Sequence, residues 1–446
     1  MIDLPPAFAR WLAADPSLVF HQTLLADMPG AELYLVGGAI RDIILGRPCK
    51  DADFVLRAVK AEDFEPWFNA HGTLDLVGRA FGVYKFIPHG HPKDRPAIDI
   101  ALPRSERPNE SSQGGYRDFD ITTNETLPIE VDLERRDFTI NAMAYDIRNN
   151  RLLDPFDGRG DLKRKLLHTV GDAHRRFSED LTRLLRGLRF ACELKLRIHP
   201  ETWKAMQMLA PALNRREETE EGSPYVVARE TIASELAKAL VADPTHATSL
   251  LTDSRFLPIL FPSIAAATLR DRQYFSPLST GSKNPNVLWV LLLRALAPTD
   301  AQALLADLRI SSMHPGHPAR PEPEDVVWIL KQLADPHPIP EQLSRFERRY
   351  LSTRGHALVD ILRALGKTNL VDQVERIRSE IYARWQTDGM PNIPELLNGH
   401  DLLRLGAAPG PIVRRILEMI RDRQLAGDIM TREAALAEAQ KQIRAD

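Results

Sequence analysis

Two aspartates separated by one residue, Asp51 and Asp53, lie in a segment that reads KDADFVL. Alternate side chains of a β-strand point to the same face, so both carboxylates would lie side by side with Ala52 turned away. Two such carboxylates can hold two Mg²⁺ ions about 3.5–4 Å apart, which clamp the attacking and leaving oxygens of a phosphoryl displacement. Mg²⁺ suits this role because it binds through one or two carboxylates together with substrate phosphates. Asp99, in AIDIAL, is either a third metal ligand or an ordinary strand residue.

A glycine turn precedes these aspartates. The apolar run Leu33–Val36 reads as a buried strand and ends at Gly37 and Gly38, after which residues 39–45 read as a short helix. Glycines at such a turn let backbone N–H groups and the helix N-terminus approach a phosphate closely. Arg41, in the first turn of the helix, could reach the same anion. Alternating acids alone are common on exposed strands, but their combination with this turn favours phosphoryl chemistry.

A second set of polar residues lies in a segment that is otherwise mainly apolar, residues 135–147, which reads RRDFTINAMAYDI. Arg136, Asp137 and Asn141 need hydrogen-bond partners if they are buried there. They could cap a helix. Alternatively, Arg136 could meet a triphosphate and Asp137 a ribose hydroxyl.

The third segment, residues 177–191, reads FSEDLTRLLRGLRFA and has leucines at the spacing of an amphipathic helix. We expect Ser178 to be its N-cap. The polar face would carry four charged residues: Asp180, Arg183, Arg186 and Arg189. By itself, the spacing of Asp180 and Arg183 favours a surface pair worth only about 0.2–0.5 kcal/mol.

The elements around these residues indicate an α+β protein. Strands are expected at 51–56, 74–77, 82–87 and 97–102, and residues 103–133 read as a long polar loop. Helical periodicity dominates beyond residue 161. A chain of 446 residues exceeds what one hydrophobic core usually supports, so at least two packed units are expected.

Composition narrows the class of protein. The N-terminus does not read as a signal peptide, and no run of about 18 apolar residues predicts a membrane span. Two cysteines, Cys49 and Cys192, are too few for a disulfide framework, so we expect a cytoplasmic protein. Net charge is only −3, but basic residues outnumber acidic ones between Lys163 and Arg216. That stretch is either a solvated helical face or a phosphate-binding surface.

The motifs occur in a recognisable order: GGAIRD, then K-D-x-D, then RRDFTINA, then LLDPFDGRGD through LLRGLRFA. Over about residues 30–265 they resemble the class II tRNA nucleotidyltransferases, or CCA-adding enzymes, and the bacterial poly(A) polymerases. The segment LNGHDLLRLG…PGPIVRRILEMI resembles the tail of bacterial CCA-adding members. The resemblance implies a nucleotidyltransferase catalytic head with a small mixed sheet at 1–160. An all-helical neck at 161–265, with a nucleotide-templating helix and an RNA-binding face, and a helical body and tail at 266–446 would follow.

The resemblance also implies roles for the residues. Asp51 and Asp53 would bind Mg²⁺ and catalyse the transfer, while Gly38, Arg41 and Arg136 would contact the nucleotide. Asp180 and Arg183 would pair with the Watson–Crick edge of CTP or ATP, with Arg186 and Arg189 adding nucleotide or phosphate contacts. The implied partner is the acceptor end of tRNA.

Two positions depart from the family pattern, and several activities stay open. Leu181 stands where the templating motif usually has proline, and Thr231 stands where arginine is common in the neck. The long segment 103–133 favours full CCA addition over CC-only addition. The absence of a strongly basic tail favours it over poly(A) polymerisation, and A-only addition is a further alternative.

From another class, a non-catalytic RNA-binding relative would have lost Asp51 or Asp53, and both are present. Some relatives carry a phosphohydrolase module with a His-Asp metal pair. The adjacent His400 and Asp401 are interpreted as structural or surface residues, since no histidine cluster surrounds them in sequence.

Overall fold

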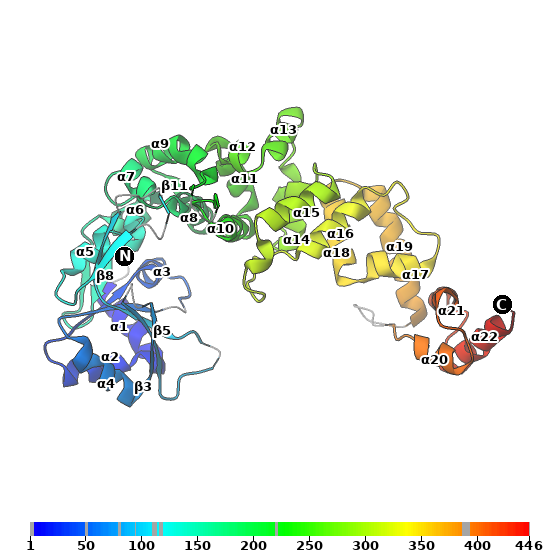
Figure 1. The fold of residues 1–446 in the computed structure, drawn as a ribbon, viewed down its shortest axis with the longest axis horizontal. Coiled ribbons are helices and arrows are strands. Elements are labelled where there is room, and N and C mark those ends of the chain that lie inside the picture. The colour runs from blue at the N-terminus through cyan, green and yellow to red at the C-terminus, as the bar shows by residue number, and fades with distance from the viewer. Residues whose placement is uncertain are drawn as a thin grey trace. The chain divides into compact units, whose positions relative to one another are not determined.

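The structure is a computed structural model that describes residues 4–49, 52–78, 82–93, 95–108, 114–115, 119–218, 222–385 and 393–445. It consists of two compact units, Met1–Pro262 and Ser263–Asp446, each described here by itself (Figure 1). The head and neck expected from the sequence both fall in the first unit. The boundary expected at residue 160 therefore stays a prediction.

The first unit contains a seven-stranded sheet in the order β3-β4-β5-β2-β1-β8-β9 (Figure 1). Its strands are β1 (Glu32–Val36), β2 (Asp53–Arg57), β3 (Gly72–Gly78), β4 (Val83–Pro88), β5 (Ile98–Ala101), β8 (Ala144–Asp146) and β9 (Arg151–Leu153). Neighbours are antiparallel except β2 and β5, which are parallel. The predicted α+β class with a mixed sheet is confirmed.

Aromatic packing closes one face of this sheet. The helices of this region are α1 (Leu4–Ala14), α2 (Phe20–Asp27), α3 (Gly38–Ile44), α4 (Ala61–His71) and α5 (Ile129–Glu134). Phe20 of α2 contacts Phe54 of β2, Phe68 of α4 and Phe86 of β4, with ring centroids 5.3–5.9 Å apart. Because side chains alternate along a strand, Asp53 and Val55 face the opposite side from Phe54.

The segment 103–133 is not the single long loop that its polar composition predicts. It contains β6 (Arg104–Pro108) and β7 (Phe119–Thr123), which pair as an antiparallel ribbon, and then helix α5. A two-stranded ribbon satisfies its backbone by cross-strand hydrogen bonds and needs no continuous apolar face, so hydropathy does not reveal it. Ile129 and Leu133 of α5 pack in a cluster with Val55 on the Asp53 face of the sheet.

The rest of the first unit is mainly helical. Its elements are α6 (Gly158–Arg164), β10 (Leu166–Leu167), α7 (Ala173–Glu179), α8 (Thr182–Leu194), β11 (Arg197–Ile198), α9 (Pro200–Leu209), α10 (Arg229–Ala242), α11 (Pro244–Asp253) and α12 (Phe256–Leu260). The helix predicted over 177–191 is broken between α7 and α8, and Ser178 is not its N-cap. The break arises because Asp180 is extended and its carboxylate accepts hydrogen bonds from the N–H and hydroxyl of Thr182.

The described part of the second unit is helical. Its helices are α14 (Pro285–Leu293), α15 (Pro298–Asp307), α16 (Pro323–Leu333), α17 (Leu343–Phe346), α18 (Thr353–Ala364), α19 (Thr368–Trp385), α20 (Gly399–Arg404), α21 (Pro411–Ala426) and α22 (Arg432–Ala445), after α13 (Pro262–Arg270) at the division between the units. Within the described ranges, no single helix is long and apolar enough to cross a membrane. Only α14 and α15 taken together pass that test, and they are bent by 118°.

Asp401 has a structural role in the second unit. Its carboxylate forms a capping box with Asn398 at the start of α20 and also binds Arg404 and Arg432. His400 beside it is exposed. The interpretation of this His-Asp pair as structural or surface residues is confirmed.

Candidate active site

The glycine turn between β1 and α3 brings two predicted site residues together. Gly37 has φ +73°, a left-handed conformation that side chains disfavour. A Cβ placed on Gly37 would lie 3.2 Å from a terminal nitrogen of Arg136 and 3.3 Å from a carboxylate oxygen of Asp53. A guanidinium and a carboxylate from distant parts of the chain therefore converge over this turn, and the missing side chain leaves room between them. Gly38, the first residue of α3, lies beneath the guanidinium of Arg41.

Carboxylates of two neighbouring strands lie side by side. Asp53, the first residue of β2, is directly paired with Asp99 in the parallel register of β5, so both side chains share one face of the sheet. Lys85 of β4 is paired with Asp99 in turn, and its ammonium lies 2.6 Å from one Asp99 oxygen. Asp51, the other predicted metal ligand, lies outside the described residues. The described pair is compatible with a hard oxygen-binding cation such as Mg²⁺.

A continuous polar chain connects α3 with α8. Arg41, the fourth residue of α3, donates to Asp42 through two nitrogens at 3.0 Å and to the side-chain oxygen of Asn141 at 2.8 Å. The amide nitrogen of Asn141 donates to Asp137 at 3.2 Å. The other carboxylate oxygen of Asp137 accepts from Arg186 at 2.6–2.8 Å.

Asp137 is thus a structural anion in this chain of contacts. Burial alone would raise its pKa, but the ion pair and hydrogen bond with Arg186 outweigh burial and lower the pKa of Asp137 to about 2. Its carboxylate also accepts the backbone N–H of Phe138. Asp137, Asn141 and Arg41 therefore hold one another in place rather than capping a helix.

Asp132 anchors the Arg-Arg pair and was not predicted. It is fully buried and binds Arg135 at 2.6 Å and Arg136 at 3.0 Å. Burial would raise the pKa of Asp132, but the two guanidinium groups lower it. Among the described residues, Nε of Arg136 is buried and has no hydrogen-bond partner. The Arg136 side chain is 18% exposed, so its guanidinium is partly accessible to an anionic ligand while Asp132 holds it in place.

Asp180 and Arg183 are not the surface pair that their spacing alone favoured. The side chain of Arg183 is only 8% exposed and lies 3.8 Å from Asp180. Its guanidinium donates to Glu179 and to the backbone carbonyls of Arg176 and Arg135 at 3.0–3.2 Å. These contacts fix Arg183 in one orientation beside Asp180.

Leu181, in the position where the family pattern has proline, joins the β6–β7 ribbon to this pair. Its N–H donates to the carbonyl of Gly114 at 2.9 Å, a bond that proline cannot make. A Cβ on Gly114 would lie 2.9 Å from the Leu181 side chain. The departure from the pattern therefore adds a contact between the ribbon and the start of α8.

Arg189 and Phe190 of α8 make further charged and aromatic contacts beside the polar chain. Arg189 binds Glu193 at 2.9 Å and Glu235 of α10 at 2.6 Å, and its guanidinium lies 4.1 Å from the centre of the Phe190 ring. Arg41 and Arg186 lie 5.3 Å from the same ring. Phe190 is thus a shared aromatic contact for cations of α3 and α8.

Sequence reasoning did not single out Glu235 or Phe190. Glu235 follows Ile232 by three residues and precedes Leu236, both buried in α10. A charged residue on such an apolar helix face needs a partner. The position of Glu235 in the sequence could therefore have indicated a buried ion pair.

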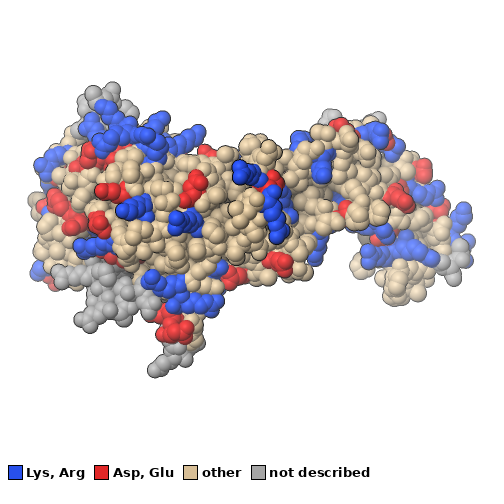
Figure 2. Space-filling view, turned by 90° about the horizontal axis from the view of Figure 1, so that it is seen from above, with Lys and Arg blue, Asp and Glu red and all other residues tan. Residues whose placement is uncertain are grey.

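The basic stretch 163–216 has two different parts. Lys163, Arg175 and Arg197 are exposed, whereas Arg183 is buried and Arg189 is half-buried. The exposed residues agree with a solvated helical face, and a phosphate-binding role of this stretch stays a prediction. Figure 2 shows that lysines and arginines gather in separate patches on the face it presents.

Comparisons with known proteins agree on one family. Residues 33–168 match the family model described as the poly(A) polymerase head domain. The chain is 33% identical over 324 residues to a CCA-adding enzyme of Pseudomonas putida, an alignment that covers 68% of this chain and 78% of that enzyme. It is 35% identical over 241 residues to a multifunctional CCA protein of Neisseria gonorrhoeae. That alignment covers 53% of this chain and only about half, 51%, of the relative.

The fold agrees with a solved structure. The CCA-adding enzyme of Bacillus stearothermophilus in complex with CTP superposes with a TM-score of 0.67 at 24% identity. The superposition covers 99% of this chain and 98% of that one.

Proposed function

The chain belongs to the family of CCA-adding enzymes, which are nucleotidyltransferases, and we propose that it adds C, C and A to the 3′ end of tRNA in the cytoplasm. The substrates are CTP and ATP, and pyrophosphate leaves at each step. The observation that carries the proposal is the convergence of Asp53 and Arg136 over Gly37, since it brings a carboxylate that could bind a metal and a cation that could bind a phosphate to the same glycine turn.

The chemistry is assigned to the carboxylates of β2 and its neighbour. Asp51 and Asp53 would hold Mg²⁺, and Asp99, beside Asp53 in β5, would be a third oxygen ligand if the ion competes with its Lys85 contact. A metal ion held by these residues would supply Lewis-acid chemistry: it would lower the pKa of the attacking 3′-hydroxyl and neutralise charge on the leaving phosphates. The protein places the carboxylates of Asp53 and Asp99 on one face of a rigid sheet, and Phe54 packs against the opposite face.

The triphosphate is assigned to the glycine turn and two arginines. A terminal nitrogen of Arg136 lies over Gly37, and Gly37 allows the phosphate to approach the backbone. Arg41 lies over Gly38 with its guanidinium held by Asp42 and Asn141. Because these contacts exist before the nucleotide binds, little reorganisation is required when charge develops on the α-phosphate.

Base selection is assigned to Asp180 and Arg183. Cytosine and adenine both present an amino donor next to a ring-nitrogen acceptor on the Watson–Crick edge, whereas uracil and guanine present a carbonyl next to an N–H. A carboxylate beside a guanidinium therefore matches both correct bases and opposes both wrong ones. Glu179 and the two backbone carbonyls hold Arg183 for this task. Arg186 and Arg189 stack on Phe190 behind it and add positive charge toward the nucleotide.

The test is extension of three tRNA transcripts that end before CCA, after the first C and after the second C. Each is incubated with Mg²⁺ and CTP, ATP or both, and products are resolved at single-nucleotide resolution. The proposal expects three additions to the shortest transcript and a stop at CCA, with no activity in excess EDTA and recovery on adding Mg²⁺.

The other outcomes separate the alternatives. A stop at CC, or addition of A to the CC-ended transcript alone, would make the enzyme a partial CCA-adding enzyme. Long A tracts on unrelated RNA would indicate a poly(A) polymerase. No extension, with tRNA binding intact, would refute an enzymatic role and favour an RNA-binding relative.

A further inference from the structure

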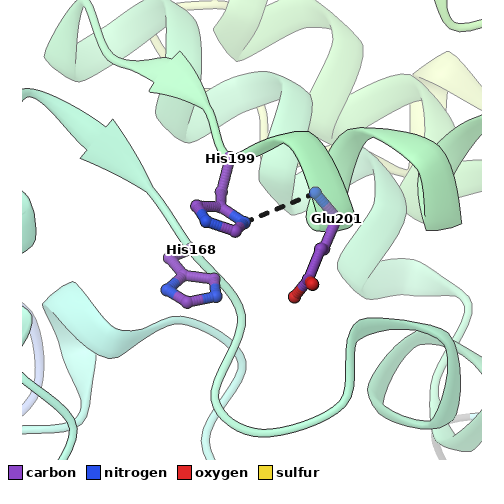
Figure 3. Close-up of side chains that lie close together, drawn as sticks. All are labelled: His168, His199 and Glu201. Atoms are coloured by element: carbon purple, nitrogen blue, oxygen red, sulfur yellow. Dashed lines mark hydrogen bonds between the residues drawn. The ribbon is translucent and has the colours of Figure 1, made fainter.

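A group of potential metal ligands lies outside the residues assigned to nucleotide transfer. His168, His199 and Glu201 each offer one ligand atom, and these atoms all lie within 4.8 Å of one another. Figure 3 shows the carboxylate of Glu201 turned toward the His168 ring, with the two imidazoles one above the other. The ring centroids are 3.9 Å apart and the planes differ by 23°.

The backbone holds the two histidines at adjacent positions. His168 follows β10 and His199 follows β11, and these strands are paired in parallel with Leu167 opposite Ile198. The N–H of His199 donates to the carbonyl of Leu167 at 2.9 Å. The carbonyl of His168 accepts the N–H of Thr139 at 2.9 Å. Ligands on hydrogen-bonded strand ends lose little conformational freedom when a metal binds.

A buried carboxylate stands behind His168. Asp161 lies 3.6 Å from Nδ1 of His168, and its own position is fixed by Thr139 at 2.7 Å and Arg164 at 2.8 Å. Metal-binding histidines commonly direct one ring nitrogen to such a carboxylate and use the other for the metal.

We propose that His168, His199 and Glu201 form a binding site for Zn²⁺, with water as the fourth ligand. Two imidazoles and one carboxylate are a frequent zinc ligand set, whereas Mg²⁺ prefers oxygen ligands alone. Tetrahedral ligands about 2.0–2.1 Å from zinc lie roughly 3.4 Å apart. Because the ligand atoms lie within 4.8 Å of one another, they must approach by at most about 1.4 Å. The exposed Glu201 side chain can turn to do so, and one of the stacked imidazoles must rotate so that both ring planes contain the ion.

The closing movement also involves His199. Its Nδ1 accepts the N–H of Glu201 at 3.4 Å, a long contact that costs little to give up. The bound ion would join residue 168 to residues 199–201, which bracket helices α7 and α8 with Asp180 and Arg183 between them. The site would thus stabilise the folded segment that carries the proposed base-reading pair.

The experiment is equilibrium dialysis of the full chain against micromolar Zn²⁺ with millimolar Mg²⁺ present, followed by measurement of zinc per chain. Wild type should retain one zinc ion, while His199→Asn and Glu201→Gln should bind at least tenfold more weakly. Glu201 is exposed, so its replacement tests the site even if the histidine variant folds poorly. His89→Asn, an exposed histidine of the same unit, is the matched control and should bind like wild type.

A second readout separates this site from the catalytic carboxylates. Asp53→Asn should retain the zinc ion, so the inference stands or falls independently of the proposed function. Zinc in large excess over its dissociation constant should raise the thermal midpoint of wild type by about 5 °C and raise that of Glu201→Gln by about half as much or less. Absence of retained zinc in wild type, or its loss in Asp53→Asn rather than in His199→Asn, would overturn the inference.

Discussion

Replacing Gly37 by alanine tests whether the space over the β1–α3 turn is used by the reaction. The new methyl group would lie 3.2 Å from Arg136 and 3.3 Å from Asp53, closer than ordinary van der Waals contact. Both groups must therefore shift by a few tenths of an ångström. A misplacement of about 1 Å can cost 10²-fold in rate, so a loss of about tenfold in kcat/KM, or about 1.4 kcal/mol of activation free energy, is expected.

Gly46→Ala is the matched control. Gly46 also has a positive φ, +65°, but a Cβ there meets nothing within 4 Å. Both variants should lose about 1–2 kcal/mol of unfolding free energy, because alanine disfavours the left-handed region. Only Gly37→Ala should be slow in single-turnover addition of AMP to a CC-ended tRNA. Equal rates for the two variants at equal stability would refute the role assigned to the turn.

Three further substitutions test the contacts behind the site. Asp137→Asn removes the counter-charge of Arg186. Because the pKa of Asp137 is held at about 2, the variant should lose about 2 kcal/mol of unfolding free energy at neutral pH, measured by urea unfolding. Glu235→Gln removes the negative charge that pairs with Arg189. It should raise the KM for nucleotide, measured by steady-state kinetics, and lower the unfolding free energy by roughly 1–3 kcal/mol, measured by urea unfolding. Leu181→Pro fits the φ of −64° at this position but removes its N–H donor, so it should alter the ratio of CMP to AMP addition more than it alters tRNA binding.

Controls and contradicting results are specific to each variant. Asp157→Asn breaks an exposed pair with Arg164 and should leave unfolding unchanged. Because the folded pKa of Asp137 is depressed, its contribution is complete above about pH 4 and is lost as pH falls toward 2, and Asp137→Asn should lack this dependence. An unchanged KM in Glu235→Gln would contradict the role given to Arg189. An unchanged CMP to AMP ratio in Leu181→Pro would show that the contact with Gly114 does not reach the templating pair.

The strands and the glycine turn could be predicted because each rests on a local signal. A continuous apolar run identifies β1, strand-like patterns identify β4 and β5, and Gly37-Gly38 marks the turn into α3. The polar ribbon β6–β7 could not be found in this way, since its pairing is satisfied by backbone contacts between segments that look like loop. The break at Asp180 was missed because a leucine stripe continues across it, and a single carboxylate decides where the helix restarts.

The partners of the charged residues were the least predictable part of the site. The sequence indicates that Arg136, Asp137 and Asn141 need partners, but not that Arg41 and Arg186 lie at the two ends of the same polar chain. Such contacts join residues up to 100 positions apart and depend on how the sheet packs against α8. Local periodicity carries no information about them.

The most direct test of the central claim compares wild type with Asp53→Asn in single-turnover addition of AMP to a CC-ended tRNA, with tRNA binding measured in parallel. If the Asp53 carboxylate of β2 carries the reaction, the variant should react at least about 10³-fold more slowly while binding tRNA with unchanged affinity. A variant that retains the wild-type rate would contradict the assignment of catalysis to this strand.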